Sequence, residues 1–254
     1  MIATCVLLRG LGREAGHWGD FLPSLRRALP DCDVVTLDLP GTGSRLHDRA
    51  PFTIRETADS VRDDAISRGL TQHPMLVFGI SLGGIVAMEW AGRHPEDVAG
   101  LVVAASSASD LSPRFKRFSP WGHLVVALNL LTRDPERRHR RLARLTLNRV
   151  DLREPFIKLC LQLERERPVA PATVQAQFDA ATNWRSPSAL QVPSLFLVGG
   201  RDRLVHRDCM RALAGRYAAP LEEHPDAGHD LTTDAHDWVA EHLARFRERI
   251  AARS

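Results

Sequence analysis

The chain has 254 residues, of which 44% are hydrophobic and 26% are charged, and its formal net charge is +3. This composition is typical of a globular protein with one large core, and it excludes disordered, collagen-like and fibrous classes. Basic and acidic residues are interspersed and the basic surplus is small. We therefore expect no nucleic acid as a partner.

The cysteines and the amino-terminal segment indicate the cellular compartment. The four cysteines are scattered without a CxxC pair, so neither a disulfide scaffold nor a zinc site is expected. Residues 1–10 lack the basic and long apolar regions of a secretion signal, which favours a cytoplasmic protein. The longest apolar run, residues 124–131, is far shorter than the roughly 18 residues of a membrane span, so we expect no membrane partner.

Short β-branched or leucine-rich runs alternate along the chain with longer helical patterns, as in βαβ units around a parallel sheet. Apolar residues at helical spacing begin at Trp18 and again at Val239, which predicts helices that pack on the sheet. The sequence predicts an α/β fold with a mostly parallel sheet of about six strands flanked by helices. The candidate strands are residues 4–8, 34–37, 75–80, 98–104, 194–198 and 219–223.

The alternation breaks between about residues 108 and 187, where prolines, arginines and amphipathic stretches dominate. We interpret this segment as an inserted helical cap. It would lie over the carboxyl ends of the strands, where open α/β sheets bind ligands. The predicted organisation is a first part of the core at residues 1–107, the cap at 108–187 and a second part of the core at 188–254.

Ser81 lies between a predicted strand and a predicted helix, within the segment Gly79-Ile80-Ser81-Leu82-Gly83. A nucleophile on such a sharp turn needs small neighbours because two elements pass close to it. The alternative is a turn serine that caps the helix. Serine is a poor nucleophile unless a histidine accepts its proton and a carboxylate orients that histidine.

Candidates for both partners follow later strands. Asp202 lies in a glycine-rich turn after the strand at residues 194–198, and His229 lies in the loop after the last predicted strand. The chain order is thus serine, acid, histidine. A structural role is the alternative for His229, and three other aspartates remain alternatives for the carboxylate: Asp110, Asp226 and Asp230.

With these segments, the sequence resembles the α/β-hydrolase superfamily over most of the chain outside the cap. Residues 79–83 resemble the nucleophile elbow, 199–202 the acid turn, 228–229 the base loop and 38–44 a loop after an early strand. The resemblance implies an oxyanion hole formed by the backbone N–H groups of Leu82 and Leu11.

The sequence departs from the family pattern in two places, and each departure leads to a structural prediction. Where the family usually has His-Gly, this chain has Arg9-Gly10, so the hydrogen bonding of this loop must differ. The chain also begins at what resembles the third strand of the family, which leaves one edge of a six-strand sheet unpaired. Because bare edges invite aggregation, we expect the cap or a second subunit, as in a homodimer, to cover that edge.

The cap contains candidate substrate-binding residues. Trp121, Phe156 and Phe178 are candidates to line a substrate pocket, although core packing is the ordinary role of such residues. Residues 114–149 contain ten basic residues against two acidic ones. A solvated helix face is the ordinary interpretation of this excess, and binding of an anionic carrier or coenzyme is the alternative.

The sequence predicts a serine hydrolase that cleaves a small carboxylic ester or related acyl compound through an acyl-enzyme, without cofactor or metal. A serine at position 81 argues against the family's dehalogenase and epoxide hydrolase chemistry, which uses a carboxylate nucleophile. The alternatives are a thioesterase for acyl-coenzyme A or an acyl carrier, a carbon–carbon hydrolase, a perhydrolase, and a non-catalytic binding protein that kept the fold.

Overall fold

The computed structural model describes residues 2–252, with all their side chains except that of Leu130. One parallel sheet runs in the order β2-β1-β3-β4-β5-β6, which confirms the predicted six-strand parallel sheet. Its strands are β1 (Thr4–Leu8), β2 (Asp33–Leu37), β3 (Met75–Ile80), β4 (Val98–Ala104), β5 (Ser194–Gly199) and β6 (Leu221–His224).

Helices cover both faces of the sheet. Those outside the segment between β4 and β5 are α1 (Phe21–Ala28), α2 (Ile54–Ser67), α3 (Leu82–Arg93), α9 (Asp208–Arg216), α10 (Leu231–Asp234) and α11 (His236–Ala251). Short 3-10 turns are η1 (Ala15–Trp18), η2 (Gly43–Arg45), η3 (Leu70–Gln72) and η4 (Pro95–Asp97).

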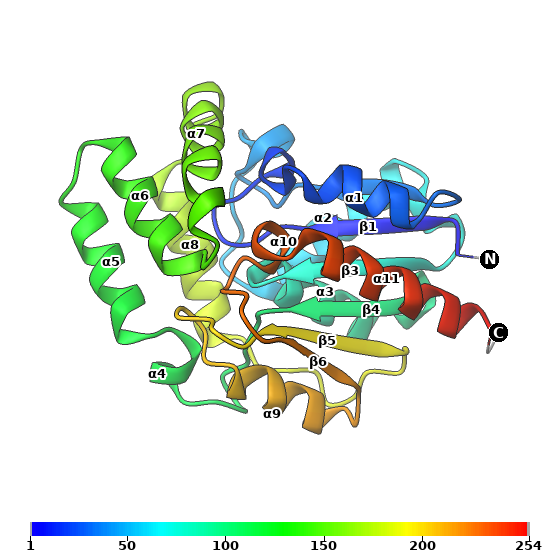
Figure 1. Cartoon of the computed structure of the whole chain (residues 1–254). Helices are drawn as coiled ribbons and strands as arrows, with labels where there is room; N and C mark the ends of the chain where they lie inside the picture. Colours follow the sequence, from blue (N-terminus) through cyan, green and yellow to red (C-terminus); the bar gives the residue numbers. More distant parts are fainter. Residues whose placement is uncertain (1, 253–254) are drawn as a thin grey trace.

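Successive residues of each strand face opposite layers, as a pleated strand requires. In β3, Val77 belongs to the layer that contains α2, α3 and α9, whereas Phe78 belongs to the layer that contains α1 and α11. Figure 1 shows α11 crossing in front of the sheet. Phe78 also contacts the rings of Trp18 and Phe21, with centroids 5.8 and 5.7 Å away, so the segment after β1 is fixed to the sheet. Such aromatic pairs contribute about 0.5–1.5 kcal/mol each beyond their buried area.

Five helices between β4 and β5 form a group at one end of the molecule (Figure 1), which we call the helical insertion. They are α4 (Arg114–Arg117), α5 (Pro120–Leu130), α6 (Pro135–Thr146), α7 (Val150–Glu166) and α8 (Pro171–Asn183). A small apolar core joins α6 to α7 through Ala143, Phe156 and Cys160. The division into core and cap at residues 108 and 187 stays a prediction.

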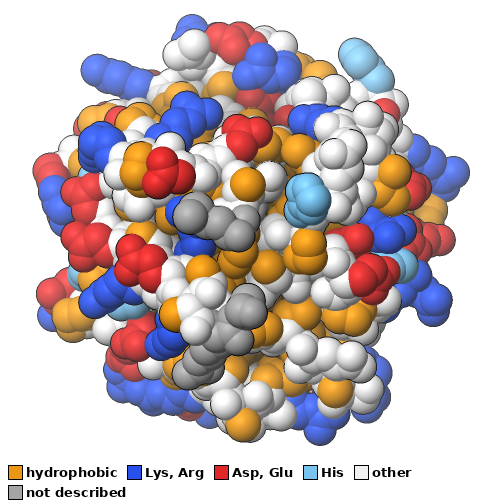
Figure 2. Space-filling view, turned by 90° about the vertical axis from the view of Figure 1, so that its right-hand side faces the viewer, with side chains coloured by type: hydrophobic (Ala, Val, Ile, Leu, Met, Phe, Trp, Pro, Cys, Tyr) orange, Lys and Arg blue, Asp and Glu red, His pale blue; other side chains and the backbone are white. Residues whose placement is uncertain are grey.

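The end of the molecule opposite the insertion contains the amino ends of the strands. Figure 2 shows acidic and basic side chains mixed around apolar ones on this face. Strand β2 forms one edge of the sheet, and the expectation that the cap or a second subunit covers this edge stays a prediction. Within residues 2–252, no helix has both the length and the apolar character that crossing a membrane requires.

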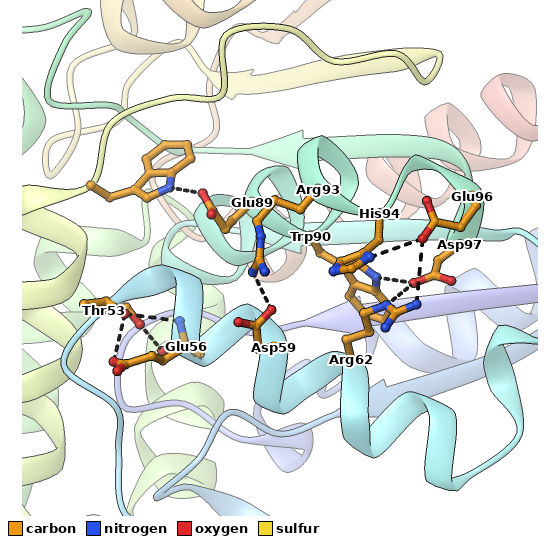
Figure 3. A network of polar contacts seen from close by, with 12 residues as sticks. Thr53, Glu56, Asp59, Arg62, Glu89, Trp90, Arg93, His94, Glu96 and Asp97 are labelled. Atoms are coloured by element: carbon orange, nitrogen blue, oxygen red, sulfur yellow. Dashed lines mark hydrogen bonds and ion pairs between the residues drawn. The ribbon is translucent and has the colours of Figure 1, made fainter.

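A polar network joins α2 to α3 and η4 at the amino end of β4 (Figure 3). The buried carboxylate of Asp97 accepts hydrogen bonds from Arg62 Nε at 2.6 Å and from Trp90 Nε1 at 2.9 Å. Arg93 pairs with Asp59 one turn further along α3. These contacts fix two helices against each other behind the sheet, far from the carboxyl ends of the strands.

Candidate active site

Ser81 lies on a sharp turn between β3 and α3. Its backbone has φ 56° and ψ −120°, a conformation that non-glycine residues rarely adopt. The turn requires glycine on both sides, because a Cβ atom at Gly79 would lie 2.3 Å from the carbonyl oxygen of Gly83, and one at Gly83 would lie 2.1 Å from that of Leu8. The side chain of Ser81 makes no capping hydrogen bond to α3, so the alternative of a helix-capping serine is wrong.

The structure brings Ser81, His229 and Asp202 together. His229 Nε2 lies 3.1 Å from Ser81 Oγ, and His229 Nδ1 lies 2.8 Å from Asp202 Oδ2. In the tautomer that donates from Nδ1 to the carboxylate, Nε2 is free to accept the proton of the serine hydroxyl. The three residues occupy loops after β3, β5 and β6, and parallel strands place such loops at the same edge of the sheet.

The environment of His229 favours its charged form. Burial by itself lowers the pKa of His229, but the charge and hydrogen bond of Asp202 more than offset burial, and the net pKa is raised above 6.5. The Asp202 side chain is fully buried, and its other oxygen accepts the amide protons of Leu204 at 2.8 Å and Val205 at 2.9 Å. These bonds fix the carboxylate in an orientation that points one oxygen at the imidazole.

The other three aspartates considered as partners of His229 bind elsewhere. Asp226 pairs with Arg201, and Asp110 accepts hydrogen bonds from the amide and hydroxyl of Ser186. Asp230 follows His229 directly, but its carboxylate binds Arg9 instead. Among the four aspartates, the structure therefore places Asp202 in contact with the imidazole.

Leu82 and Leu11, whose amides the resemblance assigns to an oxyanion hole, line the same cavity as Ser81. Leu82 is the first residue of α3, and the amides of a first helical turn have no intrahelical partner. Gly10 passes so close that a Cβ atom there would lie 3.3 Å from Ser81 Cβ. Both amides thus belong to segments adjacent to the serine hydroxyl.

Arg9, at the position where the family usually has histidine, forms a buried ion pair with Asp230. Its guanidinium donates to Asp230 Oδ2 at 2.8 Å and to Thr232 Oγ1 at 2.8 Å, and it lies 4.7 Å from the ring centroid of Trp18. Burial disfavours the charged form of Asp230, but Arg9 holds the pKa of this carboxyl well below its usual range. The pair connects the loop after β1 to the loop that carries His229.

Two further residues, Asp234 and Gln177, connect the helical insertion to these loops. Asp234 accepts amide protons from Gly228 at 2.7 Å, just before His229, and from Asn148 at 2.9 Å, between α6 and α7. Gln177 on α8 accepts the amide proton of Gly12 at 2.9 Å. Both residues are buried, and neither belongs to a motif, so no pattern in the sequence indicated them.

A cavity of about 110 Å³ opens beside Ser81 between the sheet and the insertion. Of the three predicted aromatic residues, Phe178 lines this cavity. Trp121 is 69% exposed on α5, and Phe156 packs in the small core of the insertion. Phe118 and His123 also line the cavity, with the ring of Phe118 edge-on to His123 and to Phe178. The insertion thus contributes to the lining through α4, α5 and α8, and the segments around Ser81 form the other side of the cavity.

Comparison with known proteins identifies the family. The sequence model described as the alpha/beta hydrolase family matches residues 5–242. The chain belongs to the alpha/beta hydrolase family. A pimeloyl-acyl-carrier protein methyl ester esterase from Xanthomonas axonopodis pv. citri is 30% identical over 257 residues, which cover 95% of this chain and 93% of that relative. The chain is therefore a hydrolase enzyme.

Solved structures agree on the fold. A thermophilic esterase from Thermogutta terrifontis is 20% identical with a TM-score of 0.74, and the match covers 98% of this hydrolase and 90% of the esterase. The RedJ thioesterase of the prodiginine pathway in Streptomyces coelicolor is 20% identical with a TM-score of 0.68, and the match covers 96% of this chain and 88% of that one. At these identities the likeness shows the fold alone.

One cluster in the hydrolase has the residue types of a cation site. Among residues 2–252, His94, Glu96 and Asp97 offer ligand atoms within 4.8 Å of one another (Figure 3). Arg62 pairs with both carboxylates, at 3.8 Å from Glu96 and 2.6 Å from Asp97, so a guanidinium already supplies the positive charge there. The cluster lies at the amino end of β4, whereas Ser81 follows the carboxyl end of β3.

The Arg9–Asp230 pair yields a prediction on stability. Arg9→Met leaves Asp230 buried without its guanidinium, so we expect the free energy of unfolding, measured by urea denaturation, to fall by about 3–5 kcal/mol. Arg27→Met is the matched control, because the Arg27–Asp237 pair is 3.6 Å long with side chains 70% and 65% exposed. This exposed pair contributes less than about 1 kcal/mol. Equal losses in the two variants would contradict the role assigned to Arg9.

Proposed function

We propose that this hydrolase cleaves a carboxylic ester through an acyl-enzyme on Ser81, with His229 as the general base and Asp202 as its orienting carboxylate. The observation that carries the proposal is the continuous hydrogen-bonded series from Ser81 Oγ through His229 to Asp202, with distances of 3.1 and 2.8 Å. A serine hydroxyl becomes a useful nucleophile when a neighbouring base takes its proton as the new bond forms.

In the first half of the proposed reaction, Ser81 Oγ attacks the ester carbonyl while His229 Nε2 takes the hydroxyl proton. Negative charge then develops on the carbonyl oxygen, where the amides of Leu82 and Leu11 donate hydrogen bonds. His229 next returns its proton to the departing alcohol. An ester now links the acyl group to Ser81, and the alcohol is released.

The second half repeats these roles with water. His229 takes a proton from a water molecule as its oxygen attacks the acyl-enzyme, and the proton passes to Ser81 Oγ when the ester bond breaks. Asp202 accepts the Nδ1–H hydrogen bond throughout and stabilises the imidazolium that forms in each half. The products are a carboxylic acid and the regenerated serine.

A thioester or an acyl-carrier-linked ester is the second candidate substrate. Residues 114–149 carry ten basic residues against two acidic ones, and the Xanthomonas relative is named for an acyl-carrier-linked methyl ester. Exposed arginines of the insertion would attract the phosphate of a carrier or coenzyme. Arg138 and Arg140, however, already pair with Glu164 and Glu154, so much of this charge is compensated within the insertion.

A substrate panel tests the proposed function. We expect the wild-type protein to hydrolyse p-nitrophenyl esters, and Ser81→Ala to lower kcat about 10⁴-fold or more with an unchanged melting temperature, because the covalent step is lost. The same panel includes acyl-coenzyme A substrates, so that their hydrolysis can be compared with that of the p-nitrophenyl esters. If arginines of the insertion bind the phosphates of coenzyme A, KM for these substrates should rise with salt concentration. Ester hydrolysis that survives in Ser81→Ala would exclude the proposed nucleophile.

The pH dependence tests the role of His229. The proposed base must be neutral, and its pKa is raised above 6.5, so kcat/KM should fall as the pH decreases through that raised value. Asp202→Asn removes the charge that raises the pKa of His229. We therefore expect the inflection in kcat/KM to move to lower pH, with kcat reduced about 10⁴-fold. An inflection that stays in place in the variant would contradict the assignment of Asp202.

A further inference from the structure

A buried arginine lines the cavity that contains Ser81. Arg117, the last residue of α4, is 9% exposed and lines this cavity together with Ser81 and the Leu82 segment. Arginine is rarely buried to this extent unless a carboxylate pairs with it. The contacts of Arg117 therefore decide whether the structure already satisfies its charge.

The partners of Arg117 are neutral. Its Nη1 donates to the carbonyl of Thr182 at 2.9 Å and its Nη2 to the carbonyl of Ala181 at 2.8 Å, both in the last turn of α8. The partial negative charge of a helix carboxyl end favours a cation there, but it does not equal a full counter-charge. Its Nε is buried without a hydrogen-bond partner within the described part of the chain.

No carboxylate of residues 2–252 lies within ion-pair distance of Arg117. Burial lowers the pKa of Arg117, because it disfavours the charged form of the guanidinium. Cys209 offsets part of this effect of burial and raises the pKa, Arg114 lowers it further, and Asp110 raises it least. Arg9, the other deeply buried arginine near the site, differs because Asp230 neutralises it.

The walls between Ser81 and Arg117 limit what can bind. Apolar side chains form much of the lining, among them Leu82, Ile85, Leu204 and Val205. With a volume of about 110 Å³, the cavity has room for a short hydrocarbon segment. A ligand that fits would therefore carry an ester at one end, a few methylene groups, and an anion at the other end.

On the basis of the proposed ester hydrolysis, we propose that Arg117 binds a carboxylate of the substrate, and that the substrate class is half-esters of short dicarboxylic acids. The esterified carboxyl group is attacked by Ser81, and the free carboxylate pairs with Arg117 in the same cavity. Water is consumed, the ester C–O bond breaks, and the products are the alcohol, the dicarboxylate and one proton. A planar guanidinium binds a carboxylate through two parallel hydrogen bonds, which makes arginine well suited to this recognition.

Hydrolysis of paired substrates tests this proposal. Monomethyl esters of C4–C8 dicarboxylic acids are compared with the corresponding dimethyl esters at pH 8, where the free carboxyl group is ionised. We expect kcat/KM of the wild-type protein to be at least tenfold higher for the best monomethyl ester than for its dimethyl counterpart. A wild-type protein without this preference at any chain length would overturn the proposal.

Three variants separate recognition from packing. Arg117→Gln should lower kcat/KM for the monomethyl ester at least tenfold more than kcat/KM for the dimethyl ester, mainly through KM. Arg117→Lys keeps the charge and should retain part of the preference. Arg245→Gln on the exposed face of α11 removes the same charge far from the cavity and should have no effect. Equal losses for both esters in Arg117→Gln would show that Arg117 only ties α4 to α8.

Product inhibition keeps the proposal testable if Arg117→Gln does not fold. At constant ionic strength, the dicarboxylate of the preferred chain length should inhibit the wild-type protein with a Ki at least tenfold lower than the monocarboxylate of equal length. Equal Ki values would overturn the proposal. A wild-type protein that hydrolyses esters through Ser81 but shows no preference for the monomethyl ester refutes only the role of Arg117, whereas hydrolysis that persists in Ser81→Ala refutes the proposed function.

Discussion

The hydrogen bond between His229 Nδ1 and the buried carboxylate of Asp202 is the interaction on which the proposed chemistry depends. It joins the loops after β5 and β6, and it presents the opposite nitrogen of the imidazole to Ser81. The parallel sheet makes this meeting possible, because the loops that follow its strands all emerge at one edge. Glycine at positions 79 and 83 lets the strained turn of Ser81 approach that edge closely.

The buried charges around the site are stabilised in different ways. Two backbone amides and an imidazole bind Asp202, while a guanidinium neutralises Asp230. Arg9 thereby ties the loop of the Leu11 amide to the loop of His229, so one ion pair positions both segments. Within residues 2–252, the hydrogen-bond partners of Arg117 are two carbonyls of α8, and a charge without a carboxylate partner beside a nucleophile is suited to the recognition of an anionic substrate.

The sequence predicted the features that depend on local pattern. Short apolar runs bounded by turn residues predicted the strands of the sheet, and the glycines around Ser81 predicted the sharp turn. Both features depend on short-range steric preferences of the residues involved. Contacts between distant segments carried no such signal: Arg9 and Asp230 are 221 residues apart, and nothing in the sequence placed Arg117 against the end of α8. For the same reason the aromatic residues of the insertion could not be assigned. As aromatic residues of the insertion, Trp121 and Phe178 were equal candidates for the pocket. In the structure Trp121 on α5 is exposed, whereas Phe178 on α8 lines the cavity.

The most direct test of the central claim is covalent labelling with a fluorophosphonate, followed by peptide mass spectrometry. If His229 and Asp202 activate Ser81, the wild-type protein should acquire one adduct per chain on the peptide that contains Ser81, and His229→Gln should react at least about 10³-fold more slowly because no base takes the proton. Labelling on a different serine, or equal rates in the wild type and the histidine variant, would contradict the account.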